Sequence, residues 1–245
     1  MPELYFITSP SDTSSAVKWG HPLAHMAYGT GKTRLELTVG PLALTTRGGW
    51  MVLTDHQLPP EGDVLHFAAQ VRQECRARQY QTVFLDFEQP ANDYAYELIA
   101  AVSASGLPLV VPETYANVFP QALVLIDSAI SGGNIKSYLE EQNNRWSNRI
   151  CLALHPLRMR FPLPSEKNEG EVISDYDLKT ALKTTQSYFS HDLGCRYFTQ
   201  QIQDNFTFTL FDDADSIRYK LNLADQIGIR TAVALYREIE AFLPL

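Results

Sequence analysis

The chain has 245 residues, of which 45% are hydrophobic, and it carries a formal net charge of −8. This length and apolar content are enough for one large α/β barrel core or for two small domain cores. The acidic balance excludes a general attraction to nucleic acids, and the absence of any apolar run near the ~20 residues of a membrane span argues against a membrane partner.

Eight apolar, β-rich segments follow one another along the chain, and helical patterns separate several of them. The predicted strands are residues 4–7, 25–28, 50–55, 82–88, 107–111, 122–127, 150–155 and 231–236. The predicted helices are residues 63–78, 94–103, 135–145 and 214–226. The strands show little alternation, as expected when both faces of a parallel sheet are buried. This order favours a (β/α)8 TIM barrel, and an open doubly wound sheet is the alternative.

Two segments fall outside this repeat. Residues 29–48 contain a short strand pattern and a Gly-Pro turn, which predict a small hairpin. Residues 157–213 form a long insertion between the seventh and eighth predicted strands, with a helical pattern at 174–185 and a strand pattern at 206–211. A connection of this length usually carries structure or function of its own. We therefore expect a single barrel domain over residues 1–245 that contains this insertion.

The first residues of the chain bear on its location. Residues 1–8 lack the basic region and the long apolar stretch of a signal peptide. The sequence as written therefore favours a cytoplasmic protein, and it leaves export or association with a spore open.

Two carboxylates close the fourth predicted strand. Asp86 and Glu88 are two positions apart, so alternation along a strand directs both side chains to the same side. Like charges this close raise the pKa of one carboxyl, which is how a carboxyl becomes a general acid near neutral pH. The alternative is a strand end whose acids cap the next helix or face water, and the spacing alone does not separate the two.

Other polar residues stand at the ends of predicted strands. In a TIM barrel these ends and the following loops build the active site, so such residues would converge on one mouth. Taken singly, each is more often a helix cap or a solvated strand end. The candidates for substrate contacts are Asp55, Glu113, Tyr115, His155 and Tyr236, and Asp127 is a further acid; Thr54 and Arg237 lie beside them in sequence.

No pattern in the sequence indicates a metal or a cofactor. His21 and His25 have the spacing of metal ligands on one helix face, but Pro22 follows the first and no third ligand is evident nearby. Residues 29–33 lack the first glycine of a phosphate-binding loop. We expect reduced, structural thiols at the three widely spaced cysteines, Cys75, Cys151 and Cys195.

Two segments resemble glycoside hydrolase family 18, which contains chitinases and N-acetylglucosaminidases of the spore-cortex type. Residues 85–90, Leu-Asp-Phe-Glu-Gln-Pro, are similar to the end of the family's Asp-x-x-Asp-x-Asp-x-Glu motif on its fourth strand. Residues 211–220 are similar to the family's Tyr-Asp-Asp-x-x-Ser-x-x-x-Lys segment. The resemblance implies a TIM barrel, carbohydrate as the partner, and an insertion where residues 157–213 lie.

The chain also departs from the family pattern. The first two aspartates of the motif correspond to Gln81 and Phe84, and the tyrosine of the sixth-strand Tyr-Asp pair corresponds to Ile126 before Asp127. The tryptophan that ends the last strand is replaced by Leu235 or Tyr236, depending on a shift of one residue. The third-strand Ser-x-Gly-Gly pattern is not found at residues 53–55.

The resemblance implies roles for the residues that match. Glu88 would be the general acid, Asp86 would orient the substrate's 2-acetamido group, and Asp127 would support it, in a substrate-assisted retaining hydrolysis. Loss of one such preorganised donor, the missing tyrosine, costs ~3–4 kcal/mol of transition-state stabilisation.

Two functional hypotheses therefore stand side by side. One is hydrolysis of β-linked N-acetylglucosamine glycans, chitin-like or in peptidoglycan. The other is a catalytically impaired barrel that binds glycans, with Trp50, Tyr115 and Tyr236 as stacking platforms. A structural or assembly role is a third.

Overall fold

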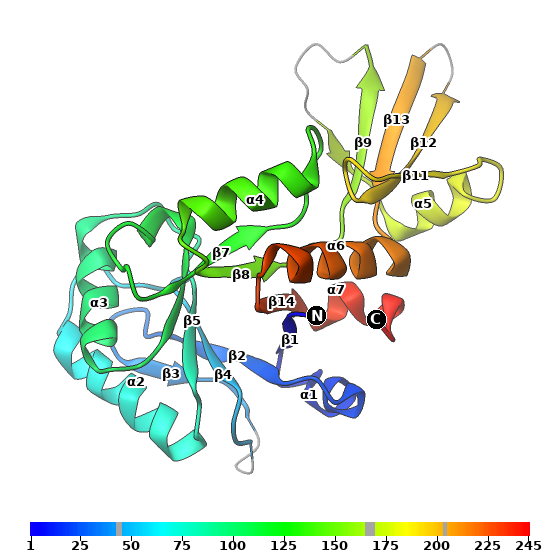
Figure 1. The fold of residues 1–245 in the computed structure, drawn as a ribbon. Coiled ribbons are helices and arrows are strands. Elements are labelled where there is room, and N and C mark those ends of the chain that lie inside the picture. Colours follow the sequence, from blue (N-terminus) through cyan, green and yellow to red (C-terminus); the bar gives the residue numbers. More distant parts are fainter. Residues whose placement is uncertain (43–45, 165–169, 203–204) are drawn as a thin grey trace.

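Eight parallel strands close into a barrel in this computed structural model, which describes residues 1–42, 46–164, 170–202 and 205–245. The ring closes because β1 pairs with both β14 and β2 (Figure 1). Its strands in ring order are β1 (Glu3–Thr8), β2 (Leu23–Thr30), β4 (Trp50–Thr54), β5 (Thr82–Asp86), β6 (Leu109–Pro112), β7 (Leu123–Asp127), β8 (Ile150–Ala153) and β14 (Thr231–Leu235). The predicted (β/α)8 barrel is confirmed, and the open sheet is excluded.

The long helices cover the outside of the barrel, and each begins at a side chain that caps it. They are α2 (Val64–Arg78), α3 (Asp93–Ala104), α4 (Ile135–Arg145) and α6 (Ala214–Ile227). Asp63, Asn92, Asn134 and Asp213 accept hydrogen bonds from the first-turn backbone N–H groups of these helices, as helix caps do. Short helices α1 (Thr13–Ala16) and α7 (Tyr236–Ile239) follow β1 and β14, with the 3-10 turns η1 (Val17–Trp19) and η3 (Glu240–Phe242) after them.

Two connections have no α-helix among the described residues. Between β6 and β7 the chain forms only the 3-10 turn η2 (Glu113–Tyr115). Between β2 and β4 it forms β3 (Leu37–Val39), which pairs antiparallel with the end of β2 (Leu23–Thr30), so the hairpin predicted within residues 29–48 uses a strand that begins before that range. Residues 43–45 of the predicted range lie outside the described residues.

The barrel has an inner and an outer apolar layer. The inner cluster includes Phe84 and Val233 and fills the space enclosed by the strands. Residues of opposite parity, such as Leu85 and Ala234, pack outward against the helices. Alternate residues along a strand face alternate layers, so a residue's position in this alternation decides whether its side chain points into the barrel or toward the helices. At the end of a strand, the same alternation decides which side chains face the mouth.

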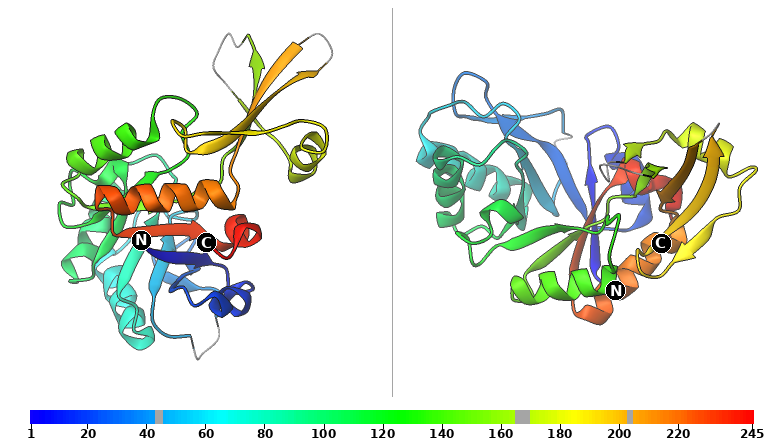
Figure 2. Two further views of the ribbon diagram at one scale, coloured as in Figure 1. Left: turned by 45° about the vertical axis from the view of Figure 1, so that its right-hand side comes forward. Right: turned by 90° about the horizontal axis from the view of Figure 1, so that it is seen from above.

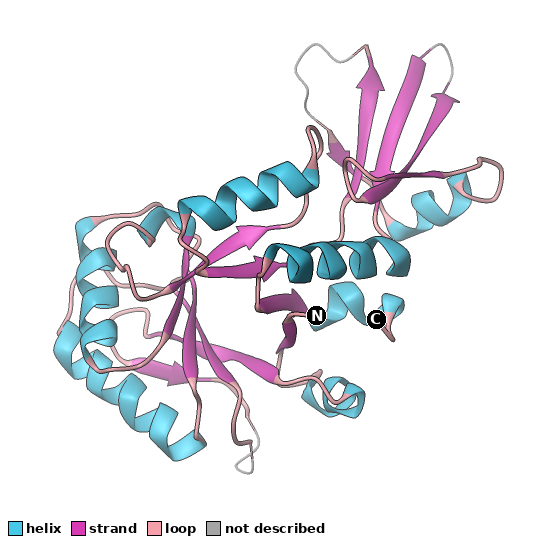
Figure 3. Ribbon diagram, viewed as in Figure 1, coloured by secondary structure: helices cyan, strands magenta, loops and turns pink. Residues whose placement is uncertain are grey.

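The segment between β8 and α6 forms a second, antiparallel sheet that stands away from the barrel (Figure 3). Its strands run in the order β10 (Glu171–Val172), β9 (Arg158–Leu163), β13 (Asn205–Phe211), β12 (Cys195–Ile202) and β11 (Tyr188–Ser190). Helix α5 (Asp175–Ala181) packs on one face of this sheet.

Residues 211–220 anchor this sheet to the barrel helices. Lys220 on α6 is fully buried, and its Nζ lies 2.7 Å from Asp212 Oδ2. Asp212 Oδ2 also accepts the backbone N–H of Leu157, 2.7 Å away, at the start of the segment. Asp213 and Ser216 form a capping box at the start of α6. A buried ion pair and a cap thus account for the acids and the lysine of this motif.

Candidate active site

Asp86 and Glu88 lie at the carboxyl end of β5, the fourth strand of the barrel in chain order. Phe84 belongs to the inner cluster, so alternation along β5 directs Asp86 toward the mouth. Glu88 lies two residues beyond the end of β5, and its charge reaches Asp86, whose pKa it raises. Asp86 is partly buried, whereas Glu88 is exposed. The mouth therefore has one deep and one solvent-facing carboxyl group.

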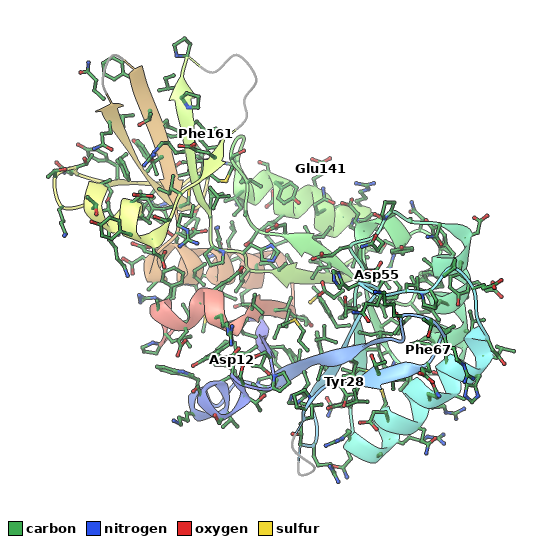
Figure 4. All side chains as sticks on the ribbon, turned by 180° about the vertical axis from the view of Figure 1, so that it is seen from behind. Asp12, Tyr28, Asp55, Phe67, Glu141 and Phe161 are labelled. Carbon is green, nitrogen blue, oxygen red and sulfur yellow. The ribbon has the colours of Figure 1, made fainter. Side chains whose placement is uncertain are left out.

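Asp55 holds the backbone that carries Glu88. Its side chain, labelled in Figure 4, is 1% exposed. Its two carboxylate oxygens accept the backbone N–H groups of Glu88 and Gln89, each at 3.0 Å. Asp55, which the sequence predicted to contact the substrate, is therefore directed at the loop after β5 rather than at the mouth. Because each oxygen has its own donor, Asp55 fixes the direction in which this loop leaves the strand.

The environment of Asp86 disfavours its charged form. Burial is the main reason that the pKa of Asp86 is raised, and the nearby carboxylates of Glu88 and Asp55 add to the effect. His155 acts in the opposite direction. A carboxyl group in this state is typical of functional sites, although ion-pair networks produce it as well.

Asp127 and His155 form a hydrogen-bonded pair on a neighbouring part of the rim. They follow β7 and β8, which are adjacent in the barrel, and His155 Nδ1 lies 2.9 Å from Asp127 Oδ2. The other oxygen of Asp127 accepts the backbone N–H of Ala129 at 2.8 Å. The hydrogen bond to Asp127 raises the pKa of His155 against the opposing effect of burial, with further support from the charges of Glu238 and Asp86.

Three predicted contact residues lie away from the mouth. Glu113 forms an ion pair with Arg145 of α4 at 2.7 Å. Tyr115 is 1% exposed and packs edge-on against Phe87, and Tyr236 is 2% exposed and donates its hydroxyl hydrogen bond to Glu240 at 3.0 Å. Neither tyrosine presents a ring to a ligand at the mouth.

The remaining strand-end residues can now be placed. Leu235 ends β14 with the inward parity of Val233, whereas Tyr236, directly after it, belongs to the outer cluster. Trp50 lies inside the barrel and stacks on Tyr5 with ring centroids 3.9 Å apart, which removes it as a sugar platform. Arg237 is held by Asp12 at 2.6 Å.

Two cavities adjoin different parts of the rim. One, of about 300 Å³, opens at the ends of β2 and β4 and includes Met26 and Thr54, whose strand neighbour is Asp86. The other, of about 370 Å³, lies between α5 and α7 and includes Glu238. The sequence analysis did not identify Glu238, because it considered the ends of the strands and Glu238 lies beyond the end of β14. Within the described residues, no group of three or more His, Cys, Asp or Glu side chains is arranged to hold a metal ion.

No family model matches the chain, and a comparison with curated proteins finds no match. Solved structures do match. A glycoside hydrolase family 18 N-acetylglucosaminidase from Paenibacillus barengoltzii superposes with a TM-score of 0.67 at 12% identity, over 99% of both chains. The Bacillus cereus spore cortex-lytic enzyme SleL gives 0.66 at 15% identity, over 95% of this chain and 70% of that one. The chitinase-like agglutinin RobpsCRA from Robinia pseudoacacia gives 0.62 at 15%, over 94% and 93%.

These matches show that the chain has the fold of family 18 glycoside hydrolases. Among the described residues, no helix is both long enough and apolar enough to span a bilayer.

Proposed function

We propose that this protein is a glycoside hydrolase of the family 18 type, acting on glycans of β-linked N-acetylglucosamine in chitin-like polymers or peptidoglycan. The observation that carries the proposal is the pair Asp86 and Glu88 at the carboxyl end of the fourth barrel strand, where a partly buried acid has an exposed acid close enough to raise its pKa. The exposed carboxyl group of Glu88 can reach a substrate as an acid catalyst, and the deeper carboxyl group of Asp86 can assist it. The structural likeness to an N-acetylglucosaminidase and a cortex-lytic enzyme supports the choice of glycan.

In the proposed reaction, Glu88 donates its proton to the glycosidic oxygen as the bond from that oxygen to the anomeric carbon breaks. The carbonyl oxygen of the substrate's own 2-acetamido group forms a bond to the same carbon and gives a cyclic oxazolinium ion. The Glu88 carboxylate then takes a proton from water, which attacks the anomeric carbon and reopens the ring. Two inversions at one carbon give a product with the starting configuration.

Asp86 has the complementary role in this scheme. Its carboxylate accepts the N–H of the acetamido group and stabilises the positive charge that develops on the oxazolinium ion. Burial and two neighbouring carboxylates raise the pKa of Asp86, so the free site holds its charge poorly. A developing positive charge on the substrate relieves that penalty in the transition state, where relief accelerates the reaction.

The second candidate function is glycan binding without turnover. Phe84 lies in the inner cluster two residues before Asp86, at a position where the family has an acid, and Ile126 stands where the family has the tyrosine. Both replacements remove polar groups that steady the reacting amide. The agglutinin among the structural matches shows that this fold also occurs in a protein named for binding.

Turnover of a chromogenic chitobioside by wild-type protein and by Glu88→Gln tests the proposal. We expect the variant to lose at least ~10²-fold in rate, because general acid catalysis contributes about that much. Glu113→Gln is the matched control, since Glu113 is an exposed glutamate paired with Arg145 away from the mouth.

The outcome separates the two functions. Equal rates for wild type and Glu88→Gln contradict the hydrolase. No turnover by either protein, together with retained binding of the same glycan, supports the binding function instead.

A further inference from the structure

The cavity of about 370 Å³ between helices α5 and α7 has no role in the reaction proposed above. The second sheet with its helix α5 and the C-terminal helix α7 lie on the same side of the molecule (Figure 2). The volume of the cavity is within the range of ~300–1,000 Å³ that is usual for sites of small ligands. The residues around it therefore indicate which chemical groups a ligand there would need.

The cavity adjoins the mouth of the barrel. Pro156, which lines it, directly follows His155, two residues beyond the end of β8. Glu238, which lines it from α7, is close enough for its charge to raise the pKa of His155. A substituent of a glycan that lies in the mouth therefore has a short path into this cavity.

Two buried polar atoms of residues that line the cavity have no hydrogen-bond partner among the described residues. One is Oδ1 of Asp212, which is 4% exposed and whose other oxygen accepts hydrogen bonds from Lys220 and Leu157. The other is Nε of Arg158, whose Nη1 is bonded to Asp175. Buried polar groups without partners are costly, so a ligand that supplies an N–H to the first atom and a carbonyl oxygen to the second is favoured. An amide group has both.

Most charged groups around the cavity already have an ion-pair partner. The pairs are Arg158 with Asp175, Asp212 with Lys220, Asp213 with Arg196 and Arg237 with Asp12. Within the part of the chain that the structure describes, Lys179 on α5 and Glu238 on α7 form no ion pair, and both are exposed. The cavity thus has one available cation and one available anion, on different helices. They match a ligand that carries both a carboxylate and an ammonium group.

We propose that this cavity binds the peptide substituent of a peptidoglycan strand. An amide of the peptide satisfies Asp212 and Arg158. A carboxylate of the peptide pairs with Lys179, and an ammonium group pairs with Glu238. The peptides of peptidoglycan combine these groups, because they contain a γ-linked glutamate and a diamino acid, whereas chitin has no such substituent. The inference rests on the proposed function for its glycan, and it selects peptidoglycan over chitin.

Isothermal titration calorimetry of the purified full chain with N-acetyl-alanyl-γ-glutamyl-lysine tests this proposal. We expect wild type to bind the peptide. We expect Lys179→Gln combined with Glu238→Gln to bind it about tenfold more weakly, or by ~1.4 kcal/mol, because two solvent-accessible ion pairs are lost. Both side chains are exposed, so neither substitution removes a buried contact of the folded protein.

Two control variants and a second peptide make the result specific. Lys183→Gln removes a lysine four residues beyond Lys179 that does not line the cavity, and Glu141→Gln removes an exposed glutamate on α4. Both controls should bind the peptide like wild type. Norleucine in place of the lysine of the peptide removes its ammonium group. Glu238→Gln should then leave binding unchanged, whereas Lys179→Gln should still weaken it, a difference that a mere change in the shape of the cavity would not produce.

The measurements also distinguish this inference from the proposed function. Peptide binding that Glu88→Gln retains and the cavity variants lose supports the peptide site even if the chain cleaves no glycan. Turnover of the chromogenic chitobioside by a wild type that binds no peptide overturns the peptide site and leaves the hydrolase standing. Equal peptide binding by wild type and the double variant also overturns it.

Discussion

Replacement of Asp55 by asparagine tests whether this buried side chain fixes the loop of Glu88. The Asp55 carboxylate accepts two backbone N–H groups, those of Glu88 and Gln89, one on each oxygen at 3.0 Å. An asparagine side chain has one acceptor oxygen, so one of these N–H groups loses its partner and faces an amide NH2 group. The shape of the side chain is otherwise preserved.

The expected cost follows from that count. A hydrogen bond to a charged group contributes ~1.5–3 kcal/mol, and an unsatisfied buried donor costs ~1–3 kcal/mol. Because the two N–H groups are partly buried, we expect Asp55→Asn to lower the free energy of unfolding by about 2 kcal/mol. We expect Asp55→Ala to cost more, because it removes both acceptors.

Urea unfolding followed by circular dichroism measures the stability, and chitobioside turnover measures the effect on Glu88. Thr54→Ala is a neighbouring control for the stability measurement, because among the described residues its hydroxyl accepts a single hydrogen bond, from the backbone N–H of His56 at 3.2 Å. If Asp55→Asn unfolds at the same urea concentration as wild type and keeps full activity, the loop does not depend on this carboxylate and the positioning argument is refuted.

Two further predictions concern the other charged pairs. Asp127→Asn should lower the pKa of His155, measured by NMR titration, because it replaces the charged acceptor of the hydrogen bond. The pair of Asp127 and His155 is exposed, so it adds only about 0.5 kcal/mol to the free energy of unfolding. Because the pKa of His155 is raised in the folded protein, this stability is present at low pH and is lost as the pH rises through the folded pKa. The free energies of unfolding of wild type and Asp127→Asn should therefore become equal in alkaline solution. Equal pKa values of His155 in the two proteins would contradict this prediction. Lys220→Ala should cost ~3–5 kcal/mol in urea unfolding because it leaves Asp212 buried without its cation, whereas the exposed Arg218→Ala should cost under ~0.5 kcal/mol. A small loss in Lys220→Ala would mean that Asp212 is solvated in the folded protein.

The barrel was predictable because each buried parallel strand can be identified from its own residues, without knowing which strands lie beside it. Each is a short apolar run, and all eight occur in the correct order. The predicted helices also agree with α2, α3, α4 and α6, since each has a capping residue at its start. The connection between the seventh and eighth barrel strands was harder to predict, because it contains both an antiparallel sheet and the short helix α5.

The site was only partly predictable, because a shift of one residue reverses the direction of a strand-end side chain. Tyr236 directly follows the inward Leu235 and is therefore buried in the outer layer. Tyr115 lies in a 3-10 turn, where strand alternation no longer applies. The pair of Asp127 and His155 requires knowing that β7 and β8 are neighbours and in which register they pair.

Strand β13 of the second sheet shows the same limit. The alternation in Phe206-Thr207-Phe208-Thr209 indicates a strand with two different faces. In the structure the threonines are buried on the side of α5 and the phenylalanines are the more exposed set, which reverses the usual arrangement. No periodicity in the sequence states which face a distant helix will cover.

The departures from the family motif have one electrostatic consequence in common. Gln81, directly before β5, and Phe84, within it, stand where the family motif has acids, and Phe84 places an apolar side chain in the barrel below Asp86. The charged groups that act on Asp86 are then the carboxylates of Glu88 and Asp55, which oppose its ionisation, and His155, which favours it. Protonation of His155 therefore offsets part of the negative charge at the mouth. The charge of His155 thus favours ionisation of a carboxyl group whose burial above Phe84 opposes it.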